Sequence, residues 1–116
     1  MNTFFQTQHL DLDIDTQSGM VSKMEGLNRF FSPDAKAFIN IEKTRASNNG
    51  DDLYYLSIQI EDGKYQYYTK EEEESVQAAF NQAYAELFRI VRDDKRKSRS
   101  LARRAGQSLK NLFRRK

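Results

Sequence analysis

The apolar positions of residues 71–103 recur at steps of three and four residues. This spacing places them on one side of an α-helix, because a helix has about 3.6 residues per turn. No Gly or Pro lies between Lys64 and Ala105, and residues 71–75 supply acidic side chains and a serine, which favour a helix N-terminus. We therefore expect one long helix that packs on a core. Its predicted core face comprises Val76, Ala79, Phe80, Ala83, Leu87, Ile90 and Val91.

Before this helix, the pattern indicates a short strand and a shorter helix. Residues 3–10 alternate in polarity, which is typical of a strand. Apolar residues at helical spacing follow over residues 20–31, and the Asp, Thr and Ser side chains of residues 15–18 can cap a helix that begins there. Residues 32–34 end it, because the proline among them removes a backbone donor and cannot continue a helix.

Three further strands are predicted between the two helices. Residues 37–42, 54–60 and 65–69 alternate in polarity, a loop rich in Ser, Asn, Gly and Asp occupies residues 46–52, and residues 61–64 form a hairpin turn. The resulting order predicts an α+β fold, a two-layer β-α-β-β-β-α sandwich. We expect a four-stranded, largely antiparallel sheet with both helices on one face.

Charge divides the chain into two parts. Residues 1–94 hold 9 basic and all 17 acidic residues, whereas the last 22 residues hold ten basic and no acidic ones. We expect an α+β domain over residues 1–97 and a basic, mobile C-terminal tail over residues 98–116, because few large apolar residues there could offset the entropy of ordering. Such a block is typical of segments that engage nucleic acid or an anionic membrane surface. On the long helix, a basic stripe comprises Arg89, Arg92, Arg96, Arg99 and Arg103.

The composition argues against catalysis. The chain has no Cys and a single histidine, His9, which excludes disulfides, thiolate metal sites and a Cys nucleophile. No Gly-rich phosphate loop occurs, and no apolar run approaches the roughly 18 residues of a membrane span. We expect a cytoplasmic protein without enzymatic activity, metal, cofactor, small-molecule substrate or membrane span. Exposed Tyr55 or Tyr68 could stack on unpaired bases, while Tyr54 is expected in the core.

Four stretches of the chain form a recognisable set of motifs. They are His9-Leu10-Asp11, Met24-Glu25-x-Leu27-x-Arg29-x-Phe31, Ile41-Glu42-Lys43, and Val76-x-Ala78-Ala79-Phe80 with Leu87-x-Arg89-x-x-Arg92-x-x-Lys95. Together they resemble the ribosome hibernation and ribosome-associated translation-inhibitor family, also called the sigma-factor modulation family, in its short form. The match covers residues 3–97, and its specificity lies in the order and spacing of the motifs.

The resemblance implies a bacterial protein that binds the small ribosomal subunit through rRNA and blocks the mRNA and tRNA channel during stress or stationary phase. Basic family positions correspond to Lys23, Arg29, Lys43, Arg89, Arg92 and Lys95. The candidate RNA-binding set adds Arg45, Arg96, Arg99 and Arg103. Glu86 stands where the family usually has Lys, and Asp93 and Asp94 interrupt the basic stripe, so residues 95–104 are the expected anchor. The free protein is expected to be a monomer, because no dimerisation domain follows.

An alternative interpretation concerns the last helical pattern of the chain. Its apolar residues could form one side of a basic amphipathic helix that binds a membrane surface or a protein partner. Those residues are Leu101, Ala105, Leu109, Leu112 and Phe113.

Overall fold

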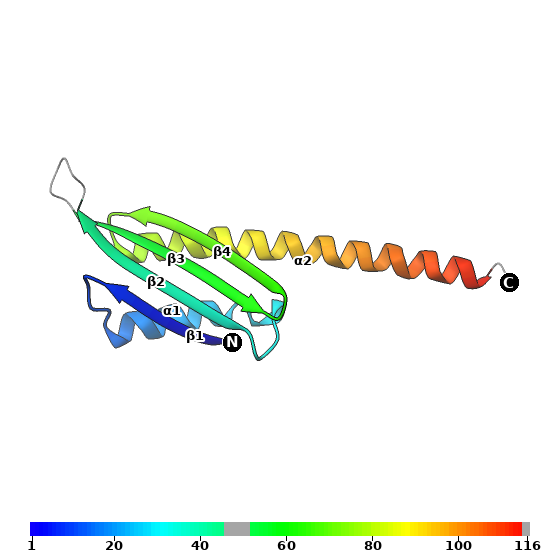
Figure 1. Cartoon of the computed structure of the whole chain (residues 1–116), viewed down its shortest axis with the longest axis horizontal. Helices are drawn as coiled ribbons and strands as arrows, with labels where there is room; N and C mark the ends of the chain where they lie inside the picture. Colours follow the sequence, from blue (N-terminus) through cyan, green and yellow to red (C-terminus); the bar gives the residue numbers. More distant parts are fainter. Residues whose placement is uncertain (46–51, 115–116) are drawn as a thin grey trace.

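The computed structural model describes residues 1–45 and 52–114, with side chains for residues 1–44 and 52–96. Its elements follow the predicted order (Figure 1). They are β1 (Asn2–Gln8), α1 (Ile14–Glu25), the short 3-10 helix η1 (Asn28–Phe30), β2 (Lys36–Arg45), β3 (Asp52–Asp62), β4 (Tyr65–Glu73) and α2 (Val76–Arg114).

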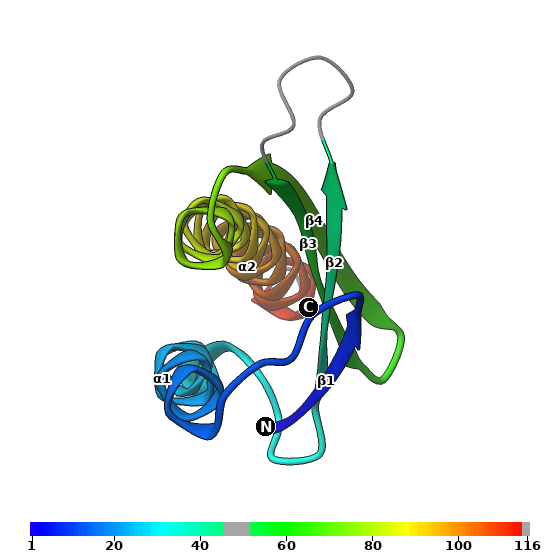
Figure 2. The same ribbon diagram turned by 90° about the vertical axis from the view of Figure 1, so that its left-hand side faces the viewer.

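The four strands form one mixed sheet in the order β1-β2-β3-β4. β1 runs parallel to β2, because α1 and η1 carry the chain back across the sheet between them, and the other two pairings are antiparallel. Both helices cover the same face of the sheet (Figure 2). The predicted two-layer α+β sandwich is therefore confirmed.

The core lies between the sheet and the helices. Alternation along the strands directs one side of each inward, so that Ile39 opposite Ile58 and Ile41 opposite Leu56 are buried. The predicted core face of α2 is confirmed, because five of its residues are buried and the other two, Val76 and Ile90, are partly buried. Buried helix residues that meet the sheet are Met20, Met24, Ala79, Phe80, Ala83, Leu87 and Val91.

Both helices begin at positions other than those predicted. Asp13 caps α1, since its carboxylate accepts a hydrogen bond from the Thr16 amide at 3.2 Å. Residues 71–73 belong to β4 instead of the α2 N-terminus, because they continue the antiparallel pairing with β3. The α2 cap is Ser75, whose Oγ accepts from the Ala78 amide at 3.1 Å. Acidic residues were thus a poor guide to this helix start.

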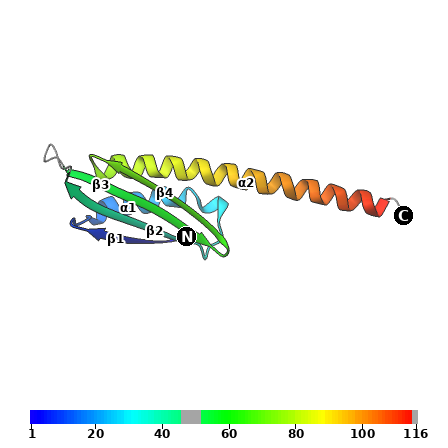
Figure 3. The ribbon, with the colours of Figure 1, turned by 45° about the horizontal axis from the view of Figure 1, so that its top comes forward.

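Two contacts fix α2 against the rest of the fold. The Thr69 hydroxyl, buried beneath the helix, donates to the Ala83 carbonyl at 3.1 Å. Gly26, at the end of α1, lets α2 approach closely, since a Cβ there would lie 3.0 Å from the Tyr84 hydroxyl oxygen. Beyond the sheet, α2 continues to Arg114 and gives the molecule a length of 73 Å (Figures 1 and 3). The division at residue 97 and the mobility of the tail remain predictions.

Candidate nucleic-acid interface

Two predicted cations from the first helical segment lie over aromatic rings of α2. Leu27 is fully buried and anchors the turn between α1 and η1, which leaves Arg29 exposed. The Arg29 Cζ lies 4.7 Å from the centre of the Phe30 ring and 5.4 Å from that of Phe88. Lys23 Nζ lies 5.6 Å from the centre of the Tyr84 ring. Cations at such distances are attracted to the negative face of a ring.

The rings beneath these cations form a continuous series that we call the aromatic seam, made of Tyr84, Phe88 and Phe30. The two α2 rings are one helical turn apart, with centres separated by 6.3 Å, and Phe30 meets Phe88 edge to face at 5.8 Å. Burial raises the pKa of the Tyr84 hydroxyl, and the nearby charge of Arg29 opposes this shift. The seam was not predicted, because its rings come from segments more than 50 residues apart in the chain.

Arg92 and Lys95 continue this row along α2. They follow Phe88 by four and seven residues, so they lie on the same side of the helix. Four predicted residues, Lys23, Arg29, Arg92 and Lys95, are thereby brought into one row. The row carries positive charge along the junction of α1, η1 and α2, which is the arrangement needed to meet phosphates of a folded RNA.

Arg89 has a different environment, because carboxylates of its own helix surround it. Its guanidinium lies 2.5 Å from Glu86 and 3.9 Å from Asp93, and Arg92 Nε lies 3.4 Å from Asp93. The hydrogen bond from Arg89 lowers the pKa of Glu86, and the same bond raises the pKa of Arg89. These exposed pairs contribute little stability, but they neutralise part of the predicted stripe.

The two adjacent aspartates have separate roles. Asp93 pairs with the stripe, whereas Asp94 turns toward the sheet and accepts a hydrogen bond from the hydroxyl of Tyr67, the buried tyrosine of β4. Burial, with the Asp94 carboxylate as a second cause, raises the pKa of Tyr67 well above its usual value. The interpretation of both aspartates as interruptions of the stripe therefore holds for Asp93 only.

Lys95 of α2 contacts the β3–β4 hairpin and the segment after η1. Its Nζ lies 4.4 Å from the centre of the Tyr65 ring and 5.5 Å from that of Phe31. Beside it, Asp62 accepts hydrogen bonds from the Ser32 amide at 2.9 Å and the Ser32 hydroxyl at 2.7 Å. These bonds, helped by Lys95, lower the pKa of Asp62.

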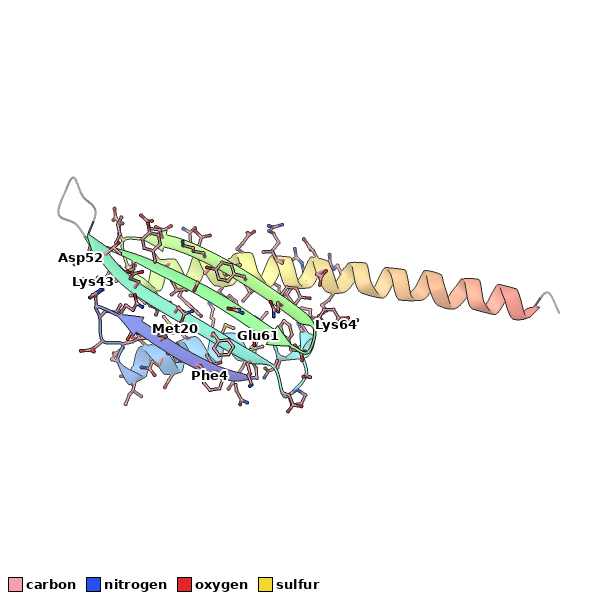
Figure 4. All side chains as sticks on the ribbon, viewed as in Figure 1. Phe4, Met20, Lys43, Asp52, Glu61 and Lys64 are labelled. Atoms are coloured by element: carbon pink, nitrogen blue, oxygen red, sulfur yellow. The ribbon has the colours of Figure 1, made fainter. Side chains whose placement is uncertain are left out.

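The remaining predicted residues are elsewhere or are not described. Lys43 pairs with Asp52 at 3.3 Å, at the end of the sheet opposite Glu61 and Lys64 (Figure 4), so it does not join the row. Arg96 is exposed on α2. The side chains of Arg45, Arg99 and Arg103 lie outside the described residues.

The open face of the sheet carries the tyrosines predicted to be exposed. Tyr68 is 57% exposed, and Tyr55 is half-buried with Lys70 Nζ 5.2 Å from its ring centre. Both line a shallow hollow of about 490 Å³, which also contains Glu42 and several amide side chains. Tyr54 is only partly buried, and the buried tyrosine is Tyr67. The hollow is lined by one acidic residue, Glu42, and one basic residue, Lys70, so it lacks the positive charge of the helical row.

Within residues 1–44 and 52–96, no three His, Cys, Asp or Glu side chains are grouped so as to hold a metal ion. None of the described helices is long and apolar enough to cross a membrane.

Comparison with known proteins relates the chain to others through structure. Neither a protein-family model nor a curated protein matches the sequence. The crystal structure of the Thermus thermophilus Protein Y N-terminal domain matches with a TM-score of 0.63 and 18% identity, over 78% of this chain and 96% of that one. A ribosomal subunit interface protein from Coxiella burnetii matches with a TM-score of 0.63 and 10% identity, over 82% and 98% of the two chains. The chain therefore has the fold of these proteins, and the resemblance indicated by its motifs is confirmed at the level of the fold.

Proposed function

We propose that this protein associates with the small ribosomal subunit through rRNA and blocks the channel for mRNA and tRNA by occupying it. The observation that carries the proposal is the fold shared with a protein named for a ribosomal subunit interface. The row of Lys23, Arg29, Arg92 and Lys95 supports it, because cations on a rigid helical layer suit the phosphates of folded RNA. Inhibition in this mechanism is steric and needs no catalytic group, cofactor or metal.

The expected setting is the bacterial cytoplasm in stress or stationary phase. Part of the affinity would come from basic residues beyond Asp94, where the sequence carries ten Lys and Arg residues and no acidic ones. Binding through phosphates releases counterions and is therefore strongly weakened by salt.

Sucrose-gradient sedimentation of purified small subunits with the protein, over a series of salt concentrations, tests this function. We expect co-sedimentation that weakens with salt and is lost after ribonuclease treatment. A second arm uses vesicles of anionic lipid without RNA. Binding to vesicles with no binding to subunits would reject the ribosomal function in favour of the membrane-surface alternative.

A further inference from the structure

Of the two arginines in the row, Arg29 is the one whose guanidinium lies over two rings from different elements. Phe30 neighbours it in η1, while Phe88 comes from α2, and the two rings meet at an interplanar angle of 76°. The two rings thus form an angled platform under the guanidinium. Arg89, in contrast, is held by carboxylates, which a phosphate would have to displace.

A supported guanidinium has a physical advantage in binding anions. Arg loses side-chain entropy when it is fixed, and its planar fork of donors matches the oxygens of a phosphate. Rings that restrict this side chain before binding reduce the ordering cost at binding. Arg29 is exposed, so its guanidinium remains accessible to a ligand.

We infer that Phe30 and Phe88 are positioning residues, which hold the Arg29 guanidinium ready to bind a phosphate of folded RNA. The inference rests on the proposed function for its ligand, and on contacts within the free protein for its geometry. A phosphate is the ligand that fits, because guanidinium donates hydrogen bonds and accepts none, and because Lys23 and Arg92 add positive charge to the same row.

The geometry is tested by NMR on the free, full-length protein. The protons along the Arg29 side chain should show ring-current shifts, and these should decrease in Phe88→Leu and in Phe30→Leu. Phe88→Tyr keeps the ring and should keep the shifts. Arg29 signals at the positions of a free arginine in the wild-type protein would overturn the inference, whatever the protein binds.

The role in binding is tested by a double-mutant cycle with small subunits. Phe88→Leu leaves the charge unchanged, so affinity should fall about two- to fivefold at every salt concentration without a change in the salt slope. Arg29→Lys keeps the charge but loses the fork and should weaken binding similarly. The double variant should bind no more weakly than the worse single variant, and Phe88→Tyr should bind as wild type does. Additive losses would overturn the inference.

Two controls separate the outcomes. Thermal melting of each variant establishes that it is folded, and Phe30→Leu, on the smaller η1 element, replaces Phe88→Leu in the cycle if the latter unfolds. Wild-type protein that binds subunits while the cycle is additive would leave the proposed function intact and reject the positioning role. Wild-type protein that does not bind subunits would reject both the proposed function and the phosphate role of Arg29.

Discussion

The hydroxyl of Tyr67 on β4 donates a hydrogen bond to the Asp94 carboxylate on α2. This bond fastens α2 to the sheet about one turn beyond Val91, the last fully buried residue of its core face. Beyond the end of the sheet, α2 continues as a projecting helix (Figure 3). Together with the contacts of Lys95, this bond attaches the last part of α2 whose side chains are described.

Replacing Tyr67 by Phe should destabilise the fold by about 1 to 3 kcal/mol, because a hydrogen bond to a charged group is lost and its acceptor is left partly buried. Thermal melting measures this change. Tyr68→Phe is the matched control, since Tyr68 is exposed on the open face and should be close to neutral. Equal melting of both variants would show that the bond contributes nothing to stability.

The raised pKa of Tyr67 also predicts an alkaline effect. A group whose pKa is higher in the folded state stabilises the protein below its unfolded pKa, which is 10.0 for tyrosine, and this contribution is lost as the pH rises above that value. In denaturant unfolding between pH 8 and pH 11, the free energy of unfolding should therefore fall more steeply with pH for wild type than for Tyr67→Phe. If the free energies of unfolding of the two proteins fell in parallel with pH, the raised pKa of Tyr67 would be contradicted.

The lowered pKa of Asp62 predicts the opposite pH dependence of stability. Its pKa is lowered by hydrogen bonds from Ser32, so it stabilises the folded state above its unfolded value of 3.8, and this contribution disappears as the pH falls through the lower folded value. Asp62→Asn should flatten the acid limb of the stability profile. Asp34→Asn, an exposed aspartate in the neighbouring loop, provides the control.

Glu86→Gln should strengthen binding to small subunits, because it removes the nearer of the two carboxylates that pair with Arg89 and makes the guanidinium more available to phosphates. The slope of log affinity against log salt should steepen, by at most about 0.7 to 0.9 for one additional effective contact. Glu74→Gln removes the same charge from an exposed position before α2 and should change the slope much less. If both variants bind alike, net charge alone controls the interaction.

Truncation after Arg96 tests the contribution of the basic C-terminal segment. It removes eight Lys and Arg residues and leaves every described contact of the domain in place. We expect the shortened chain to melt cooperatively as a monomer while its affinity and salt slope fall more than those of an Arg89→Gln, Arg92→Gln double variant. A larger effect of the double variant would assign the main anchor to the domain.

Periodicity along the chain determined the fold class and most of the core. The spacing of Ala79, Phe80, Ala83, Leu87 and Val91 defines the buried side of α2 without reference to any other segment, because burial follows the helical repeat. The alternation in β2 and β3 similarly identifies Ile39, Ile41, Leu56, Ile58 and Ile60. Helix boundaries were less predictable, since Glu71 and Glu73 serve equally as cap residues or as the end of an edge strand, and the pairing of β4 with β3 decided between them.

Charge patterning identified which residues are basic, but only the tertiary structure decided which of them act together. Lys43 and Arg29 are equivalent cations in the sequence, yet one pairs with Asp52 at the end of the sheet and the other lies on Phe88. Asp93 and Asp94 are neighbours with different partners, because successive helix residues point about 100° apart. Sequence periodicity determines the face of an element on which a side chain lies, whereas its partners depend on how distant elements pack together.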